Sequence, residues 1–326
     1  MYVSIKWKFI LTIAFVIIFT LVCSIIEIPW WHALEAELGP VIATLVIIGL
    51  AVLPGIMISI TICGVLLDKP RRREIVEEEL PPITILTAAY NEESSIYDTI
   101  ASISKQDYPN TIIVKVIDNN STDNTKSEIM RAIEDFSNLK VEYIFERKQG
   151  KYAALNNGLF KTNTEYVITI DADTYLYTDS LKYLVNAIVQ ESKNKQVGAI
   201  AGTVLVKNSR ENLLTKMQEW EYFLSIAAIK RCQGLFQSTL VAQGAFSIYR
   251  TDLLKDIQGW KDSIGEDIVL TWEILSRGYR TYYEDLAVSF TNVPTKLTVF
   301  TRQRARWARG KSYTGPLNIC VMPLLS

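Results

Sequence analysis

An apolar run ends in two carboxylates at Val167–Thr174, which reads Val-Ile-Thr-Ile-Asp-Ala-Asp-Thr. A short uninterrupted run of this kind is typical of a strand buried on both faces of a parallel sheet. Open α/β sheets bind ligands at the carboxyl ends of such strands. Asp171 and Asp173 stand at that position and can hold a hard cation such as Mg²⁺ or Mn²⁺ beside substrate phosphates. The alternative is an Asp-rich turn without a ligand, because Asp-x-Asp pairs are common by chance.

On both sides of this run, strand patterns alternate with helical patterns. Strands are expected at 83–89, 112–117, 141–145 and 166–170, and helices at 92–104, 122–136, 152–160 and 179–190. Such alternation predicts an α/β fold with a parallel, right-handed, doubly wound sheet.

The other strand ends are also polar. Tyr90-Asn91-Glu92 follows the first strand and Asp118–Asp123 follows the second. Turn formation and helix capping explain several of these residues. They explain less well why acids end three strands at one edge, where like charges repel unless a cation compensates. Lys151, at the start of the third helix, suits a phosphate oxygen, although a solvated loop lysine is the plainer interpretation.

Two later stretches also carry chemistry. Gln243-Gly244 precedes a short apolar strand, and its glycine allows either close approach of a ligand or a bulge. Glu266-Asp267 opens a helix, where the helix dipole alone favours carboxylates. An Asp at a rigid helix start is also a good general base.

Two amphipathic segments remain. Leu213–Lys230 has apolar residues at near-helical spacing and forms either core or a helix at a membrane interface. Lys296–Lys311 contains six basic residues and no acid. It can lie on anionic lipid, or its arginines can grip a pyrophosphate.

The composition points to a membrane. The 326 residues are 49% hydrophobic, and Phe9–Ile26 and Val41–Leu67 carry no charge. Each segment is long enough to cross the hydrocarbon core, and Pro54-Gly55 predicts a kink or tilt in the second. A signal peptide is the alternative for the first, but no cleavage site follows and a second apolar segment comes at once.

Charges around these segments predict their orientation. Basic residues stand before the first segment and after the second, at Lys6, Lys8, Lys69, Arg71, Arg72 and Arg73. The loop Glu27–Pro40 between them has only acids and His32. Both ends, and everything after Leu67, are therefore expected in the cytoplasm.

Several function classes are excluded. The net charge of −1 provides no overall positive field that would attract nucleic acid. The four cysteines show no metal-ligand spacing, and the single histidine lies on the far side of the membrane. Zinc sites built on histidine and Ser-His catalysis are therefore not expected in the cytoplasmic part.

Together these residues resemble the family-2 glycosyltransferases, in particular the membrane-embedded processive synthases of chitin, hyaluronan, poly-N-acetylglucosamine or cellulose. The resemblance runs from about Pro82 to Tyr313. The motifs stand in the family's order as Tyr90-Asn91-Glu92, Asp118–Asp123, Gly150-Lys151 with Ala154-Leu155-Asn156, Asp171-Ala172-Asp173, Glu266-Asp267 and Gln303-Arg304-Ala305-Arg306-Trp307. The last matches Gln-x-x-Arg-Trp of the processive members. Each match alone is a weak to moderate signal, but six in order are highly specific.

The resemblance implies a GT-A fold, which is Rossmann-like with a mostly parallel sheet, behind N-terminal transmembrane helices. The expected organisation is two transmembrane helices at 1–67, a charged linker at 68–82, the GT-A domain at 83–292, and a basic interfacial helix with Gln-x-x-Arg-Trp and a tail at 293–326. The protein is thus expected in a membrane as a multi-pass enzyme with a cytoplasmic catalytic domain.

The resemblance also implies residue roles in an inverting transfer from a UDP-sugar. Asp171 and Asp173 bind Mg²⁺ or Mn²⁺, and Asp267, paired with Glu266, takes the proton from the acceptor hydroxyl. The implied donor contacts are Tyr90, Glu92, Asp118, Lys151, Asp171 and Arg306, and the implied acceptor contacts are Gln243, Gly244, Gln303 and Trp307.

Two departures matter. Asn119 and Asn120 replace the acid or glycine often seen after Asp118, and the chain stops at Ser326, soon after the last motif. Two spans cannot enclose a polymer channel, so the expected alternatives are a truncated product, assembly with further membrane subunits or a homo-oligomer, or no translocation. The acceptor is then a growing β-linked hexosamine-type polymer or, for a single transfer, a lipid. An inactive membrane subunit is a third hypothesis, disfavoured because every catalytic position is retained.

Overall fold

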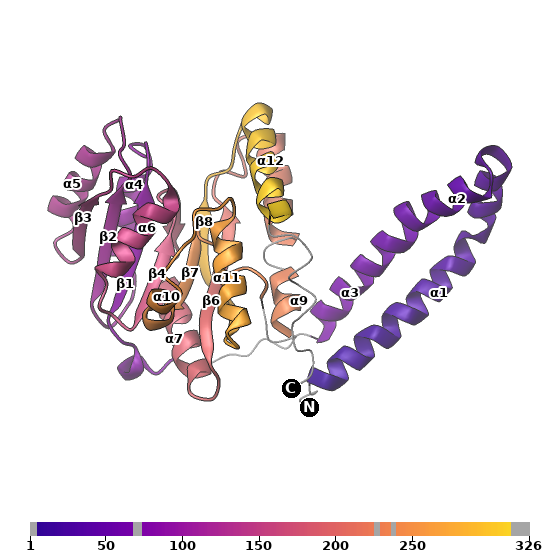
Figure 1. Cartoon of the computed structure of the whole chain (residues 1–326), viewed down its shortest axis with the longest axis horizontal. Coiled ribbons are helices and arrows are strands. Elements are labelled where there is room, and N and C mark those ends of the chain that lie inside the picture. The colour runs from indigo at the N-terminus through magenta and orange to yellow at the C-terminus, as the bar shows by residue number, and fades with distance from the viewer. Residues whose placement is uncertain (1–4, 68–73, 225–228, 236–238, 314–326) are drawn as a thin grey trace. The chain divides into compact units, whose positions relative to one another are not determined.

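The computed structural model describes residues 5–67, 74–224, 229–235 and 239–313. These divide into two compact units. The first contains α1 (Ile5–Leu38), α2 (Pro40–Ile47), α3 (Leu53–Leu67) and α9 (Ile229–Leu235), and the second contains a sheet with its covering helices (Figure 1). Residues 68–73 of the expected linker and 314–326 of the expected tail lie outside the described residues.

In the first unit, α1 runs alongside α2 and α3 as a helical hairpin (Figure 1). Trp7–Leu38 and Pro40–Gly64 are long and apolar enough to cross a membrane, by length and composition. The loop expected at Glu27–Pro40 is instead helical as far as Leu38, even though Pro29 lies inside the helix. The chain reverses at Gly39, whose φ of 78° is a conformation that glycine adopts without strain.

The kink expected at Pro54-Gly55 takes the form of a π-helical turn at Ile48–Val52. A proline inside a helix removes one backbone hydrogen bond and its ring clashes with the carbonyl four residues earlier. For Pro54 that carbonyl belongs to Leu50, inside the wider turn. The π turn therefore accommodates the proline while the helix continues as α3.

The second unit is built on an eight-stranded sheet with strand order β3-β2-β1-β4-β7-β6-β8-β5. Its strands are β1 (Ile83–Ala89), β2 (Ile112–Asp118), β3 (Lys140–Phe145), β4 (Tyr166–Ile170), β5 (Thr174–Leu176), β6 (Val197–Val206), β7 (Phe246–Arg250) and β8 (Arg280–Thr291). Its helices are η2 (Glu77–Glu79), α4 (Ile96–Ser104), α5 (Thr125–Asp135), α6 (Lys151–Phe160), α7 (Ser180–Ser192), α8 (Leu213–Tyr222), α10 (Thr251–Asp256), α11 (Glu266–Ser276) and α12 (Leu297–Tyr313).

The first half of the sheet is parallel, as predicted. β1 pairs with β2 and β4, β2 pairs with β3, and Ala89 stands opposite Asp118 in the register. The strand ends therefore meet at one edge. Helices α4 and α5 begin later than expected because turns precede them, with Asn91 and Asn120 in the left-handed region at φ 57° and 63°. Asparagine tolerates this conformation better than most residues.

The second half of the sheet is mixed, but β6 and β8 pair in parallel and only β5 and β7 run against the other strands, so the sheet as a whole is mostly parallel, as predicted. β7 runs antiparallel to β4 and β6, and β5 runs antiparallel to β8. After β6 the chain passes through α8 and α9 and enters β7 at the edge where β6 ended, so β7 must run back. As a result, the residues before β7 lie beside the end of β4, and the Asp171 amide donates to the Ala245 carbonyl over 3.3 Å.

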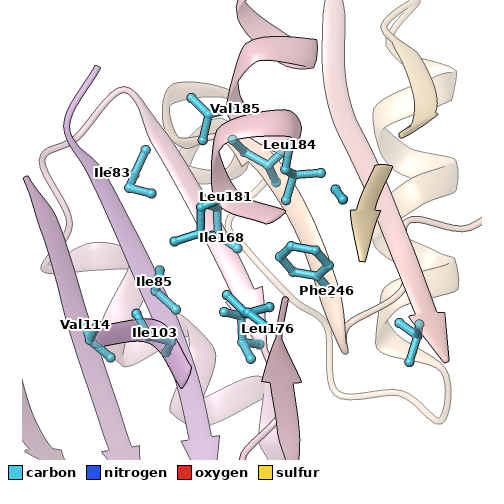
Figure 2. Packing of buried hydrophobic residues seen from close by; sticks show 14 of the residues in the cluster. Ile83, Ile85, Ile103, Val114, Ile168, Leu176, Leu181, Leu184, Val185 and Phe246 are labelled. Carbon is cyan, nitrogen blue, oxygen red and sulfur yellow. The ribbon is translucent and has the colours of Figure 1, made fainter. Parts of the chain in front are cut away.

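Two hydrophobic clusters cover the two faces of the sheet. One joins Ile83, Ile85 and Ile168 to residues of α4 and α7 (Figure 2), and it extends to Ile129 and Ala132 of α5. The other joins Leu86 and Val167 to α6, α10 and α11. Helix α6 lies especially close, because a Cβ at Gly158 would stand 2.8 Å from the Leu86 side chain. This packing places the first turn of α6 at the carboxyl edge of the sheet.

Helices α8 and α12 lie next to each other beyond β6 and β8. Asn212 caps α8 by accepting from the Thr215 amide over 2.9 Å, and its own side chain donates to the Thr295 carbonyl just before α12. Gln218 of α8 donates to the Pro294 carbonyl over 2.8 Å. The segment expected as one helix at 213–230 thus forms α8 and the start of α9, with residues 225–228 outside the described residues.

Candidate active site

A cavity of about 500 Å³ opens where β1, β2 and β4 end. This volume is in the range of small-molecule sites in proteins. The cavity is lined by Ala88, Ala89, Tyr90, Glu92, Asn119, Gln149, Gly150, Lys151, Asp171, Ala172, Asp173 and Arg306. The structure therefore brings together most of the residues that the sequence assigns to a donor and a metal, from four strand and helix ends and from α12.

Lys151 is the first residue of α6 and forms an ion pair with Asp171. Its Nζ also lies 4.0 Å from Oε1 of Glu266. Burial alone would lower the pKa of Lys151, but the neighbouring charges of Asp171, Glu266 and Asp267 outweigh it and raise that pKa. Lys151 is thus fully charged at neutral pH and connects the end of β4 with the start of α11.

Asp173 faces the same cavity without a comparable partner. No ion pair joins Asp173 to a Lys or Arg among the residues that the structure describes. Burial raises its pKa to about 7, and the charges of Asp171 and Glu92 add to the rise. The pKa of Glu92 is also raised, chiefly by burial and then by Asp171 and Asp123. A cation placed among these carboxylates would relieve their repulsion.

The two aspartates fit a hard divalent cation. Their oxygens are the ligand type that Mg²⁺ and Mn²⁺ prefer. The backbone between them is fixed, because the Thr99 hydroxyl donates to the Ala172 carbonyl over 2.8 Å. Within the described ranges no three His, Cys, Asp or Glu side chains form a ready-made metal centre. Asp171 and Asp173 would therefore leave the other coordination positions to water and substrate phosphates.

Tyr90 stands half-exposed at the cavity, whereas Asp118 is buried behind it. The carboxylate of Asp118 accepts from the Tyr143 hydroxyl over 2.9 Å and from the Ser121 amide over 3.0 Å. Asp118 is not part of the cavity wall. Its visible role is to fix the loop after β2, rather than to present a carboxylate to the cavity.

The residue that reaches the cavity from β2 is Asn119, which the sequence treats only as a departure from the family pattern. Its Oδ1 accepts from the Gly150 amide over 2.8 Å, and its Nδ2 donates to the Lys148 carbonyl over 2.6 Å. Asn119 thereby holds the loop before α6, where Gly150 has a φ of 127°. The only sequence signal for this role is its place directly after Asp118.

Gly244 lies beside Lys151, as the antiparallel direction of β7 requires. A Cβ at Gly244 would stand 3.0 Å from Lys151 Nζ, so the position has room for glycine and little more. The Gly244 amide donates to Oδ2 of Asp267 over 3.4 Å. Asp267 also accepts from the Ile268 amide over 2.9 Å, in the first turn of α11. The structure thus gathers Lys151, Gly244, Glu266 and Asp267.

Gln243 faces the sheet rather than the cavity. Its side-chain amide donates to the Gly202 carbonyl of β6 over 2.8 Å. This bond ties the entry of β7 to β6. The structure therefore separates Gln243 from Gly244, although the sequence predicts both as acceptor contacts.

The basic segment 296–311 forms most of α12, and only part of it reaches the cavity. Arg306 lines the cavity. Arg304 donates to Glu221 of α8 over 2.6 Å, and to the Gln303 side chain over 3.1 Å. Its guanidinium also lies 4.2 Å from the Trp307 ring centre, and Trp307 in turn contacts Tyr222. Gln303 and Trp307 therefore belong to the α8–α12 contact and flank the cavity residue Arg306.

The sequence model of "Glycosyltransferase like family 2" matches residues 81–310. Two curated relatives are poly-beta-1,6-N-acetyl-D-glucosamine synthases. The Staphylococcus aureus (strain COL) protein is 33% identical over 241 residues, which cover 74% of this chain and 57% of the relative. The Staphylococcus epidermidis protein is 32% identical over 250 residues, covering 74% and 58%. The chain thus spans little more than half the length of these relatives.

A similar fold occurs in a solved structure, the mannosyltransferase PcManGT from Pyrobaculum calidifontis in complex with GDP-Man and Mn²⁺. The TM-score is 0.64 at 24% sequence identity, and the match covers 78% of this chain and 69% of that one. This likeness shows the GT-A fold: a mixed α/β sheet with polar strand ends gathered at one edge.

Proposed function

The chain belongs to glycosyltransferase-like family 2, and from that premise we propose that it is an inverting glycosyltransferase that transfers a sugar from a UDP-sugar to a growing polysaccharide. The observation that carries the proposal is the gathering of Glu92, Lys151, Asp171 and Asp173 around one cavity at the carboxyl edge of the sheet. A cavity with paired carboxylates and a charged lysine suits a metal-bound diphosphate better than a neutral ligand.

The nucleoside lies at the β1 and β2 end of the cavity in this proposal. Tyr90 and Glu92 contact the base and ribose, and Asp118 supports the contact through the loop that it fixes. Lys151, at a helix N-terminus, and Arg306 of α12 bind the diphosphate oxygens. The GDP-Man held by PcManGT supports a nucleotide sugar as the donor class, and the synthase relatives favour a hexosamine.

Asp171 and Asp173 hold the divalent cation, Mg²⁺ or Mn²⁺. When bound, the cation supplies charge neutralisation at the departing diphosphate. No protein acid is then required at the leaving oxygen. The Mn²⁺ of PcManGT supports the metal class, and the raised pKa of Asp173 supports the position.

Asp267 takes the proton from the acceptor hydroxyl as that oxygen attacks the anomeric carbon from the side opposite the diphosphate. Its carboxylate is held by the Gly244 and Ile268 amides, so the base is fixed before the substrate arrives. Glu266 keeps Lys151 close to this site. Trp307 and Gln303 on α12, with Gly244 before β7, border the acceptor, and Gln243 supports Gly244 through its bond to β6.

The proposed acceptor is a β-linked hexosamine polymer. The match with Gln-x-x-Arg-Trp and the two poly-beta-1,6-N-acetyl-D-glucosamine synthases support this assignment. The apolar helices Trp7–Leu38 and Pro40–Gly64 support a multi-pass membrane protein. The distribution of lysine and arginine around them supports a cytoplasmic catalytic domain. Residues 83–292 are then the GT-A domain, and 293–326 the basic segment at the membrane surface.

Membranes that contain the full chain, supplied with radiolabelled UDP-sugars and Mn²⁺, test this function. We expect a long, alkali-stable polymer from UDP-N-acetylglucosamine and no product when EDTA removes the metal. Label found only in an organic extract would indicate a single transfer to a lipid. No incorporation from any UDP-sugar would contradict the proposal.

A further inference from the structure

A second cavity, of about 370 Å³, adjoins the first along the loop before α6. Its walls are the first turn of α6 and the residues just before α11. It shares Gly150 and Lys151 with the larger cavity and extends to Glu266. A ligand in this second cavity would therefore lie next to Glu266, which precedes Asp267, while a diphosphate occupied the first.

The second cavity offers an aromatic surface beside hydrogen-bonding groups. Tyr152 contributes its ring, and Asp262 and Ser263 contribute an exposed carboxylate and an exposed hydroxyl. The ring lies over the backbone of Gly150, where a Cβ would stand 2.7 Å from a ring carbon. Lys148 approaches the same ring, with its Nζ 5.1 Å from the ring centre. The Tyr152 ring thus contacts the Gly150 backbone and the Lys148 ammonium, and its remaining surface forms part of the cavity wall.

The charges of this cavity argue against a second phosphate. Asp262 and Glu266 are both carboxylates, and Lys151 is already paired with Asp171 and Glu266. An anion would meet two carboxylates there, and the nearby cation Lys148 is exposed and already interacts with Asp262 and Glu146. A pyranose ring has the complementary chemistry, because one face presents C–H groups to an aromatic ring and its edge presents hydroxyls to carboxylates.

We propose that this second cavity is a pyranose subsite, in which Tyr152 packs against the sugar ring while Asp262 and Ser263 accept or donate hydrogen bonds to its hydroxyls. The volume suits one sugar ring and its substituents and is at the small end of ligand sites. The inference rests on the proposed function, because the sugar is either the one carried by the donor or the terminal one of the acceptor. In both cases Tyr152, Asp262 and Ser263 help to determine which sugar is used.

The test measures donor and acceptor separately, with the full chain in detergent micelles and Mn²⁺. Titration calorimetry gives the Kd of UDP, which lacks a sugar, and of UDP-N-acetylglucosamine. Initial rates against an N-acetylglucosamine oligosaccharide give the acceptor KM. The variants are Tyr152→Ala, Asp262→Asn and Ser263→Ala, with Tyr152→Phe as the variant that keeps the ring. Glu134→Gln, an exposed carboxylate on α5 away from both cavities, is the matched control.

If the cavity is a pyranose subsite, Tyr152→Ala should weaken the binding of one sugar ligand about tenfold, because an aromatic contact and its buried area are lost. Tyr152→Phe, which keeps the ring, should recover most of that loss, and Glu134→Gln should stay within about twofold of the wild type. Weaker binding of UDP-N-acetylglucosamine with an unchanged Kd for UDP would assign the cavity to the donor sugar. A raised acceptor KM alone would assign it to the acceptor.

Unchanged constants for Tyr152→Ala, Asp262→Asn and Ser263→Ala in an active enzyme would overturn the subsite and leave the proposed function standing. Equal weakening of UDP and UDP-N-acetylglucosamine would also overturn it, because the loss would then lie in the nucleotide cavity. A wild-type chain that neither binds nor transfers any UDP-sugar would overturn both.

Discussion

Arg304 of α12 donates a hydrogen bond to Glu221 of α8 over 2.6 Å, and the same guanidinium lies 4.2 Å from the ring centre of Trp307. The ion pair thus holds the helix that carries Arg306 into the cavity. Arg304 is one-fifth exposed, so its charge is only partly screened by water. Glu221 and Arg304 are positioning residues rather than catalytic ones, because neither lines the cavity.

Glu221→Gln should raise the KM for the UDP-sugar several-fold and change kcat less, because α12 no longer holds Arg306 in place. Steady-state kinetics with varied donor measure this split. Glu219→Gln, two residues earlier on the same helix and exposed, is the control. The charge exchange Glu221→Arg with Arg304→Glu should restore part of the loss. Equal donor KM values in all four proteins would contradict the positioning role.

Gly244→Ala should reduce transfer without unfolding the protein. The new Cβ would lie 3.0 Å from Lys151 Nζ, the mobile end of a flexible side chain, so Lys151 moves away from Asp171. Loss of a correctly placed charge is expected to lower kcat/KM by about one order of magnitude. Tm by intrinsic fluorescence and kcat/KM are the two readouts. Gly49→Ala, where a Cβ meets nothing within 4 Å, should alter neither. A Gly244→Ala enzyme of full activity would contradict the account of this contact.

Asp173→Asn should make the metal-free protein more stable than the wild type, and this difference should grow as the pH rises. The pKa of the Asp173 carboxyl is about 7 in the folded protein, against an ordinary value of 3.8. Between these two pH values the carboxyl is ionised in the unfolded state and still protonated in the folded state. Stability of the wild type therefore falls from about pH 4 to pH 7 and then levels, whereas asparagine does not titrate. Each unit of pKa difference corresponds to about 1.4 kcal/mol. Melting curves in EDTA from pH 5 to pH 8 should show a widening Tm advantage for Asp173→Asn.

The same variant should lose its response to the metal. Mn²⁺ should raise the Tm of the wild type and leave that of Asp173→Asn almost unchanged, because binding to the folded state alone stabilises it. Equal Mn²⁺-induced shifts in the two proteins would place the cation elsewhere.

Asn119→Ala should weaken donor binding through the loop before α6. It removes the bonds to the Gly150 amide and the Lys148 carbonyl, and unpaired buried groups cost roughly 1–3 kcal/mol. Asn119→Asp keeps the acceptor for the Gly150 amide but loses the donor to the Lys148 and Glu146 carbonyls, so it should lie between the wild type and Asn119→Ala. UDP titration with Mn²⁺ gives the three Kd values, and the reverse order would contradict the loop's role.

The parallel half of the sheet could be predicted closely from the sequence. Ile83–Ala89 and Tyr166–Ile170 have the predicted bounds because apolar runs buried on both faces leave little choice of position. The strand direction of β7 could not be predicted, because it depends on where the chain returns after α8 and α9. That return is what brings Gly244 to Lys151.

The carboxylates of the cavity could be predicted from their positions at strand ends, whereas contacts between distant elements could not. Asp118 belongs to the acidic motif but is buried, and its neighbour Asn119 lines the cavity instead. Glu221 and Arg304 are 83 residues apart and carry no local pattern that pairs them. Tyr152 and Asp262 likewise line one cavity because α6 and α11 pack on the same face of the sheet.

The most direct test of the central claim is the transfer rate of Asp267→Asn compared with its affinity for UDP. Asparagine keeps one of the two oxygens, so it can accept from the Gly244 or the Ile268 amide but not from both, and it cannot take a proton from the acceptor at neutral pH. The account predicts an unchanged Kd for UDP and a loss of sugar transfer of about 10²–10⁴-fold, the range of general base catalysis. Transfer at the wild-type rate by Asp267→Asn would contradict it.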